Sequence, residues 1–324
     1  MNNFIKSLSN YLRFIMKDKQ RRLNFILLSL IFIITPTQNY YAKLEIKPDR
    51  PVIREIDIEL PNIQKLPINT TGIKVPYLTA KSIIALDVAS KTLIFDKNPD
   101  AKIMPASTTK IMTALVSLEH WNLTDVLEVK NGFYIGQSMK LQKAEKITME
   151  SLLYGLLVAS GNDAAYTLAE NYPGGLKNFV DKMNEKNLKL NLNNTHFINP
   201  AGVEEEEHLT TAHDLAILAS EAINNKTLLK IASTPEIVIT DVSGEISHKL
   251  KNINELLGKI EGVKGLKTGW TEAAGECLIT LVERDGNQVM FVVMNSQDRF
   301  GETIKLINWV FENFSWQIPK SIQN

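Results

Sequence analysis

The order of strand-like and helix-like segments along the chain constrains its fold more than any other feature of the sequence. Alternating and β-branched residues predict strands early and late in the chain, at residues 81–88, 91–96, 265–269, 276–284 and 288–295. Helical patterns occupy the middle and close the chain, at residues 105–118, 148–159, 164–173, 176–188, 208–222 and 302–314. We therefore predict one α+β domain, in which an antiparallel sheet gathers strands from both ends of the chain. Helices pack the sheet, and the helical middle forms a subdomain.

Composition excludes some classes of partner. The 324 residues include 36 Lys and Arg against 36 Asp and Glu, so the formal net charge is zero. Beyond the N-terminal tail there is no long basic stripe, which argues against nucleic acid as a partner. The single cysteine, Cys277, cannot form an intramolecular disulfide, and its apolar surroundings at 277–282 predict a buried structural thiol.

The first 42 residues have the layout of a secretory signal. Four basic residues between Lys17 and Arg22 precede an apolar run at 23–34 and a polar stretch that ends at Ala42. We predict that 1–42 is a signal peptide or, second, an uncleaved anchor, since the run is shorter than the ~20 residues that span a bilayer. The protein is then exported, to the periplasm or the outer face of the cytoplasmic membrane, and touches the membrane only through this segment. The fifteen residues before Met16 make this segment long for a signal peptide, so translation from Met16 is an alternative start.

Domain boundaries follow from composition. Residues 43–78 are rich in proline and charge, which predicts an extended linker. The folded domain is expected at 79–316, and 317–324 would be a short tail. No internal repeats are present.

Ser107 and Lys110 are three residues apart in a predicted helix that Pro105 introduces. Residues at this spacing share a helix face, so the hydroxyl and the amine can meet. A lysine with a lowered pKa can act as the base that activates a serine nucleophile. On these residues alone, a Ser/Thr cap on an ordinary amphipathic helix is the favoured alternative.

Two further motifs change that balance. Ser160-Gly161-Asn162 falls in a predicted loop between helices, and Lys267-Thr268-Gly269 lies on or at the end of a predicted strand. Each alone is no more than a polar turn. Ser-x-x-Lys, Ser-x-Asn and Lys-Thr-Gly in this order, on helix, loop and strand, are the signature of penicillin-binding proteins and class A β-lactamases.

The sequences around the motifs closely resemble the serine D-alanyl-D-alanine carboxypeptidases, which are low-molecular-mass penicillin-binding proteins. The resemblance covers residues 79–314, and it rests on PASTTKIMTAL at 105–115, LLVASGNDAA at 156–165 and GLKTGWT at 265–271. It implies a DD-peptidase/β-lactamase-like fold, peptidoglycan stem peptides ending in D-Ala-D-Ala as substrate, β-lactams as covalent inhibitors, and neither a metal nor a cofactor. The β-rich C-terminal domain common in the family is expected to be missing, because ten residues follow Phe314.

The resemblance also implies roles for individual residues. Ser107 would be the acylated nucleophile, Lys110 its base, and Ser160 a relay of the proton to the leaving D-alanine. Asn162 would hold the peptide carbonyl of the substrate and order the lysine. Lys267 would lower the pKa of a neighbouring lysine by like-charge repulsion.

Further residues would bind the substrate. The backbone N–H groups of Ser107 and Trp270 would form an oxyanion hole, and Thr268 would bind the terminal carboxylate beside Gly269, which permits close approach. Arg299 matches the place of a family arginine near that carboxylate, although a solvated charge at the start of a helix is an equal alternative on burial grounds.

Rival functions remain open at this point. A D,D-endopeptidase that cuts cross-links would use the same machinery. A class A β-lactamase needs a glutamate on a loop after the second motif, but 196–202 has none, and Glu204–Glu207 fits a solvated loop tip. A metal site on His196, His208, His213 and Asp214 is disfavoured, since no His-Glu-x-x-His motif occurs. A non-catalytic binding module is disfavoured by the intact motifs.

Overall fold

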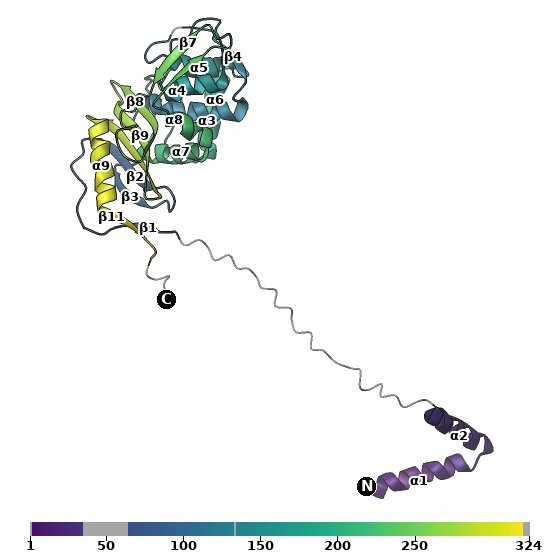
Figure 1. Ribbon diagram of the computed structural model, residues 1–324. Coiled ribbons are helices and arrows are strands. Elements are labelled where there is room, and N and C mark those ends of the chain that lie inside the picture. Colours follow the sequence, from purple (N-terminus) through teal and green to yellow (C-terminus); the bar gives the residue numbers. More distant parts are fainter. Residues whose placement is uncertain (1, 35–63, 133, 320–324) are drawn as a thin grey trace. The chain divides into compact units, whose positions relative to one another are not determined.

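The computed structural model describes residues 2–34, 64–132 and 134–319 (Figure 1). Packing divides the chain into two units, residues 1–61 and 62–324. In the first unit, helix α1 spans Asn2–Met16 and helix α2 spans Lys19–Ile34. None of the helices within the described ranges combines the length and apolarity that a membrane crossing requires. The predicted signal at 1–42 ends outside the described residues.

One antiparallel sheet of five strands organises the larger unit (Figure 1). The strand order is β3-β2-β10-β9-β8, so two early strands join three late ones, as predicted. The strands span Ser82–Asp87 (β2), Leu93–Lys97 (β3), Val263–Thr271 (β8), Gly275–Arg284 (β9) and Asn287–Ser296 (β10). This order leaves β8 and β3 as the two edges of the sheet.

Helices cover both faces of this sheet. Alternate residues of β10, Phe291 and Val293, pack with Leu306 and Ile307 of helix α9, which spans Arg299–Asn313. The opposite face packs against helices α7 (Ala212–Asn224) and α8 (Lys226–Ala232). The period-2 alternation therefore supplies two apolar layers, one on each side of the sheet. Cys277 is buried in the second of these layers, as predicted.

A helical subdomain occupies the middle of the chain, as predicted. Its helices are α3 (Lys110–His120), α4 (Met149–Leu157), α5 (Asn162–Asn171) and α6 (Gly175–Lys189). The Thr148 side chain accepts a hydrogen bond from the Ser151 N–H and caps α4. Two short hairpins that the sequence patterns did not predict accompany these helices: β4 (Val126–Glu128) with β5 (Lys146–Thr148), and β6 (Glu236–Thr240) with β7 (Ser247–Lys251).

The predicted start of the domain is wrong. Residues 64–78, assigned to the linker, are packed: strand β1 (Leu66–Asn69) pairs with β11 (Phe314–Gln317). Leu78 is buried, and Val75 packs against the same cluster. The strand was not predicted because it contains Pro67, which argues against a central strand. In a two-stranded ribbon each strand has one edge without ladder hydrogen bonds, and proline is tolerated there. The rest of the predicted linker, 43–63, lies outside the described residues.

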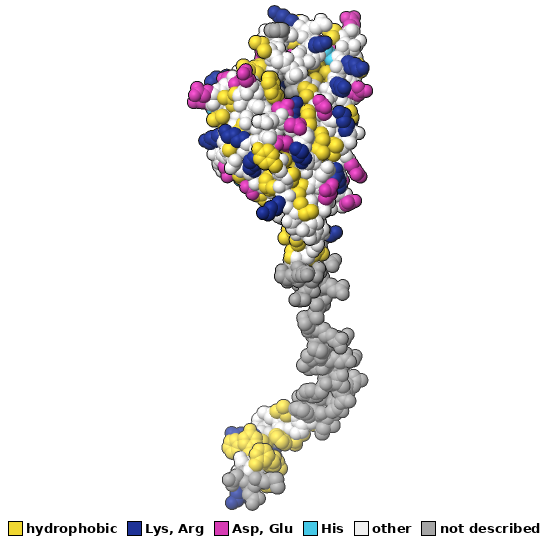
Figure 2. Space-filling model, turned by 90° about the vertical axis from the view of Figure 1, so that its left-hand side faces the viewer, with side chains coloured by type: hydrophobic (Ala, Val, Ile, Leu, Met, Phe, Trp, Pro, Cys, Tyr) yellow, Lys and Arg dark blue, Asp and Glu magenta, His cyan; other side chains and the backbone are white. Residues whose placement is uncertain are grey.

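Charges of both signs are interspersed on the face of the larger unit that Figure 2 shows. Lys and Arg side chains alternate there with Asp and Glu, and no stripe of one sign is present on that face. The acidic run Glu204–Glu207 is exposed, as expected of a loop tip.

Candidate active site

Ser107 lies on a 3₁₀ turn, Ala106–Thr109, that leads directly into helix α3. The expected first helical turn is thus tighter than an α-helix. Ala106 has φ +48°, a left-handed conformation that is rare for a residue with a Cβ. A Cβ on Gly202 would lie 1.8 Å from the Ala106 carbonyl oxygen, and one on Gly269 would lie 3.1 Å from the Ser107 nitrogen. Two glycines therefore allow two other segments to approach the nucleophile turn closely.

The amine of Lys110 meets three oxygen atoms in the interior. Its Nζ lies 2.8 Å from Ser107 Oγ, 2.8 Å from Asn162 Oδ1 and 2.7 Å from the Ala201 carbonyl oxygen. A neutral amine has two N–H donors and one lone pair. It can therefore donate to Asn162 and Ala201 while it accepts the hydroxyl proton of Ser107, which is the arrangement that a general base requires.

Burial and neighbouring charge favour the neutral form of this amine. Burial lowers the pKa of Lys110 well below its ordinary value of 10.5, and the positive charge of Lys267 lowers it further, whereas Asp163 acts in the opposite direction. Burial also lowers the pKa of Lys267 to about 7, with Arg299 as the second cause. Lys267 and Arg299 thus bring positive charge to the site, which would attract a substrate that carries a carboxylate.

The second motif reaches the nucleophile through Asn162. Its side-chain oxygen accepts from Lys110, and its Nδ2 donates to the Ile135 carbonyl oxygen at 2.6 Å. Ser160 is buried on left-handed backbone with φ +57°, in the loop after α4, while Asn162 is already the first residue of α5. The predicted loop is therefore a four-residue link, 158–161, that places Ser160 two residues before the amide that orders the lysine.

The third motif lies on the edge strand β8, next to the nucleophile turn. Lys267 and Thr268 are buried, and Lys267 Nζ donates to the Thr268 carbonyl oxygen at 3.0 Å. Gly269 contacts the Ser107 turn as described above. The side chain of Trp270 is 63% exposed, so it stands at the rim of the site rather than inside it.

Arg299 lies beside the third motif and is not a solvated charge. Its Nη1 donates to the Gly269 carbonyl oxygen at 2.9 Å, and its backbone N–H donates to Glu276. Its Nε is buried and has no hydrogen-bond partner among the described residues. A buried donor without a partner is costly, so this nitrogen is a candidate for binding an anionic ligand.

Supporting residues around Asn199 were not assigned a role from the sequence. The Asn199 side-chain oxygen accepts from the N–H groups of Ala201, Gly202 and Val203, at 3.2, 2.8 and 3.0 Å. This loop presents the Ala201 carbonyl to Lys110. Residue type gives no signal for this contact, because any residue at position 201 could supply the backbone carbonyl.

Asp163 is a second support that sequence reasoning missed. Its carboxylate accepts from the N–H groups of Met139 and Leu141 and from the Ser138 hydroxyl. The segment that Asp163 holds also contains the Ile135 carbonyl that binds Asn162. Asp163 therefore helps to position the segment 135–141, which contacts Asn162.

The histidines that were considered as metal ligands have separate partners. His208 is buried, with Nε2 3.0 Å from the Thr109 hydroxyl, and burial lowers its pKa to about 4. His213 pairs with Asp100, and Asp214 accepts from Thr195. His208 thus supports the turn that carries Ser107 and Lys110.

Comparison with known proteins places this site in a family context. The model of the family described as D-alanyl-D-alanine carboxypeptidase matches residues 69–298. The D-alanyl-D-alanine carboxypeptidase DacF of Bacillus subtilis is 32% identical over 246 residues, which cover 72% of this chain and 63% of that protein. The D-alanyl-D-alanine endopeptidase of Escherichia coli is 29% identical over 243 residues, 72% of this chain and 78% of that one. This chain thus spans less than two thirds of the length of DacF.

Solved structures agree with the sequence relatives. The crystal structure of a Streptomyces DD-transpeptidase superimposes with a TM-score of 0.71 at 31% identity, covering 74% of this chain and all of that one. The α+β fold of the DD-peptidases predicted from the motifs is thereby confirmed. With the family match spanning most of the packed unit, the chain belongs to the D-alanyl-D-alanine carboxypeptidase family of peptidases.

Proposed function

We propose that the protein is a D-alanyl-D-alanine carboxypeptidase that removes the terminal D-alanine from peptidoglycan stem peptides. The observation that carries the proposal is the buried Lys110 amine, 2.8 Å from the Ser107 hydroxyl and held by two further acceptors. Relatives that carry this name support the choice of substrate.

The acylation step follows from the geometry. The neutral Lys110 amine takes the hydroxyl proton, and Ser107 Oγ attacks the carbonyl carbon between the two D-alanines. The N–H groups of Ser107 and Trp270 would stabilise the oxyanion. The peptide C–N bond then breaks as its nitrogen gains a proton through Ser160, and D-alanine leaves. Water hydrolyses the resulting ester and restores the Ser107 hydroxyl.

Substitution of the nucleophile tests this function. Purified protein is expected to release D-alanine from a peptide ending in D-Ala-D-Ala and to form a covalent adduct with penicillin. Ser107→Ala should abolish both signals. Ser117→Ala is the matched control, because Ser117 is a buried serine of α3, the helix that follows the Ser107 turn, and its hydroxyl has no partner among the described residues. Penicillin labelling that survives in Ser107→Ala would contradict the assignment.

Arg299 would bind the carboxylate of the terminal D-alanine, with Thr268 beside it. Its unpartnered Nε and its contact with Gly269 support this role. Arg299→Ala is expected to raise KM for the peptide about tenfold or more, since a charge-assisted hydrogen bond is lost. Arg284→Ala, on strand β9, is the control and should leave KM unchanged. An unchanged KM in Arg299→Ala would refute the role.

A D,D-endopeptidase is the second candidate, because the Escherichia coli relative is named so. That activity would use the same nucleophile on a cross-linked D-alanyl bond. Parallel rates of D-alanine release from pentapeptide and of cleavage of a cross-linked dimer separate the two functions. Faster cleavage of the dimer would overturn the carboxypeptidase proposal.

We propose further that the protein acts outside the cytoplasmic membrane and touches the membrane only through its N-terminal segment. The order of basic, apolar and small residues in 1–42 supports export. Helix α1 adds support, because exposed apolar residues such as Phe4, Leu8 and Tyr11 recur at helical spacing. Fractionation and N-terminal sequencing of the protein made in a bacterium test the proposal. Recovery in the cytosol would contradict it.

A further inference from the structure

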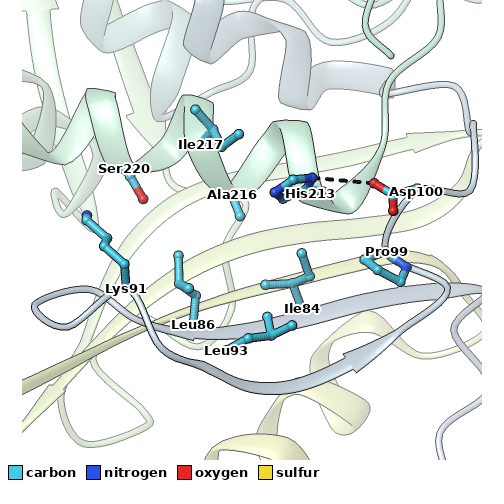
Figure 3. A pocket seen from close by; sticks show the side chains of 10 residues that line it. All are labelled: Ile84, Leu86, Lys91, Leu93, Pro99, Asp100, His213, Ala216, Ile217 and Ser220. Atoms are coloured by element: carbon cyan, nitrogen blue, oxygen red, sulfur yellow. Dashed lines mark ion pairs between the residues drawn. The ribbon is translucent and has the colours of Figure 1, made fainter. Parts of the chain in front are cut away.

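A cavity of about 450 Å³ lies between helix α7 and the β2–β3 edge of the sheet (Figure 3). It is remote from the catalytic centre, because β3 and β8 are opposite edges of the five-stranded sheet. Four strand spacings of ~4.8 Å separate those edges, roughly 19 Å in all. The volume falls within the range of ligand pockets, about 300–1,000 Å³.

The body of the cavity is apolar. Ile84 and Leu86 of β2 and Leu93 of β3 form one wall, and Ala216 and Ile217 of α7 form the other (Figure 3). Leu93 is 46% exposed at the mouth. An apolar wall of this kind gains by covering hydrocarbon, at ~25 cal/mol for each Å² removed from water.

Two hydrogen-bond donors stand at one end of the cavity. In the view of Figure 3, Lys91 and Ser220 lie at the same end. The Ser220 hydroxyl is buried without a hydrogen-bond partner among the described residues. Lys91 comes from the turn between β2 and β3, and its backbone has φ +58°, where glycine or asparagine would be easier to accommodate. Backbone conformation therefore does not explain the lysine.

The polar groups at the other end are already paired. His213 Nδ1 lies 3.4 Å from an Asp100 carboxylate oxygen (Figure 3). The Asp100 carboxylate at this end repels an anion rather than attracting it. The charge asymmetry of the cavity is thus set by the ammonium of Lys91.

We propose that this cavity binds a small anionic amphiphile, a molecule with a short hydrocarbon body and a carboxylate head. The hydrocarbon lies between α7 and the two strands, and the carboxylate accepts from the Lys91 ammonium and the Ser220 hydroxyl. A carboxylate accepts from the unpartnered hydroxyl and also neutralises the lysine, whereas a neutral amide head can do only the first. This site is separate from the proposed peptidase reaction and does not depend on it.

Calorimetry with octanoate and its neutral match octanamide tests the proposal on the full chain. Octanoate is expected to bind about tenfold more tightly than octanamide, as a charge-assisted contact implies. Ile217→Trp, which fills the cavity, should remove the binding of both probes. Equal binding of the two probes would overturn the anionic head, and octanoate binding that persists in Ile217→Trp would overturn the location.

A second variant guards against loss of folding. Lys91→Gly removes the ammonium and suits the left-handed backbone, so it is expected to fold at least as stably as the parent. It should lose the preference for octanoate while octanamide binds as before. Lys249→Gln, an exposed lysine of β7, is the control and should change neither affinity. A preference for octanoate that survives in Lys91→Gly would refute the assigned head-group contact.

Discussion

At the scale of single residues, the two buried lysines of the site have different surroundings. Lys110 is held by three oxygens, which an amine can contact in its neutral form while it takes the proton of Ser107. Lys267 contacts one carbonyl and lies near Arg299, where a positive charge would attract a carboxylate. Burial first, and then the positive charge of Lys267, lower the pKa of Lys110 and so favour its neutral form.

These different surroundings predict a bell-shaped pH dependence of kcat/KM. Activity should rise with pH as Lys110 loses its proton, and fall as Lys267, with its pKa lowered to about 7, loses its own. In Lys267→Arg the guanidinium stays charged, so the fall on the alkaline side should move up by at least two pH units, although the maximum drops. The kcat/KM profile for D-alanine release between pH 5 and 10 is the measurement. An alkaline limb that stays in place would assign it to another group.

Lys267 is also predicted to cost stability. Its folded pKa is lower than its unfolded value of 10.5, so the unfolded chain binds more protons between pH 7 and 10.5, and stability rises with pH across that window. Lys267→Met should therefore stabilise the protein at pH 7 by roughly 2–4 kcal/mol, with a smaller gain at pH 10. Urea unfolding at both pH values measures this.

The exposed lysine Lys249 provides the control for that measurement. Lys249→Met is expected to change the free energy of unfolding by less than about 0.5 kcal/mol at either pH. A Lys267→Met protein that is less stable than the parent at pH 7 would show that the buried ammonium is well compensated.

Motifs predicted side chains that the structure brings together, but not the groups that hold them. Ser107, Lys110, Asn162 and Lys267 were identified because their chemistry needs particular side chains at fixed spacing. The Ala201 group that accepts from Lys110 is a backbone carbonyl, so the sequence at position 201 gives no sign of this contact. The sequence alone could not decide between a solvated and a buried Arg299, because burial depends on how α9 meets β8.

At the scale of elements, the nucleophile turn depends on close packing against a loop. Gly202 has φ +77°, and a Cβ there would lie 1.8 Å from the Ala106 carbonyl oxygen. The loop cannot move away freely, since the Ala201 carbonyl holds Lys110 at 2.7 Å. Glycine is therefore required both by the backbone angle and by the approach.

A matched pair of glycine substitutions separates these two requirements. Gly244 has the same φ of +77°, but a Cβ there would meet nothing within 4 Å. Gly244→Ala should cost about 1 kcal/mol of stability and leave activity intact. Gly202→Ala should lower kcat for D-alanine release by about 100-fold or more, because it displaces the turn beneath Ser107. Equal activities of the two variants would refute the steric requirement.

Long, strongly patterned elements were predicted well, and short ones were missed. The helix expected at 176–188 is α6 at Gly175–Lys189, and the strand expected at 276–284 is β9 at Gly275–Arg284. The short strands of the β4–β5 and β6–β7 hairpins were not predicted. Three to five residues give too few alternations to separate a strand from a loop, and partners distant in the chain decide the outcome.

At the scale of the whole packed unit, segments from the two ends of the chain complete each other. Strand β2 pairs with β10 about two hundred residues later, and β1 pairs with β11. Glu302 of α9 accepts hydrogen bonds from the N–H groups of Thr79 and Ala80, just before β2. Neither end can form its part of the core without the other, which is why a boundary placed from composition alone came out too late.

Truncation at the predicted boundary tests whether residues 64–78 belong to the folded unit. A chain that begins at residue 79 lacks β1, the buried Leu78, the hydrogen bond from Thr70 N–H to the Asn313 carbonyl, and the bond from Trp309 Nε1 to the Ile73 carbonyl, both 2.9 Å. Compared with a chain that begins at residue 64, it should lose roughly 3–5 kcal/mol of unfolding free energy, from one buried leucine and several orphaned partners. Urea unfolding of the two chains measures the difference.

Trp309→Phe in the longer chain isolates one part of that loss. It removes the bond to Ile73 and little of the apolar contact, so it should cost about 1 kcal/mol. The catalytic groups lie on other elements, and D-alanine release below the unfolding transition should therefore be similar in all three proteins. If the chains that begin at 64 and 79 unfold at the same urea concentration, residues 64–78 add nothing to the core, and the domain starts where proline-rich composition first placed it.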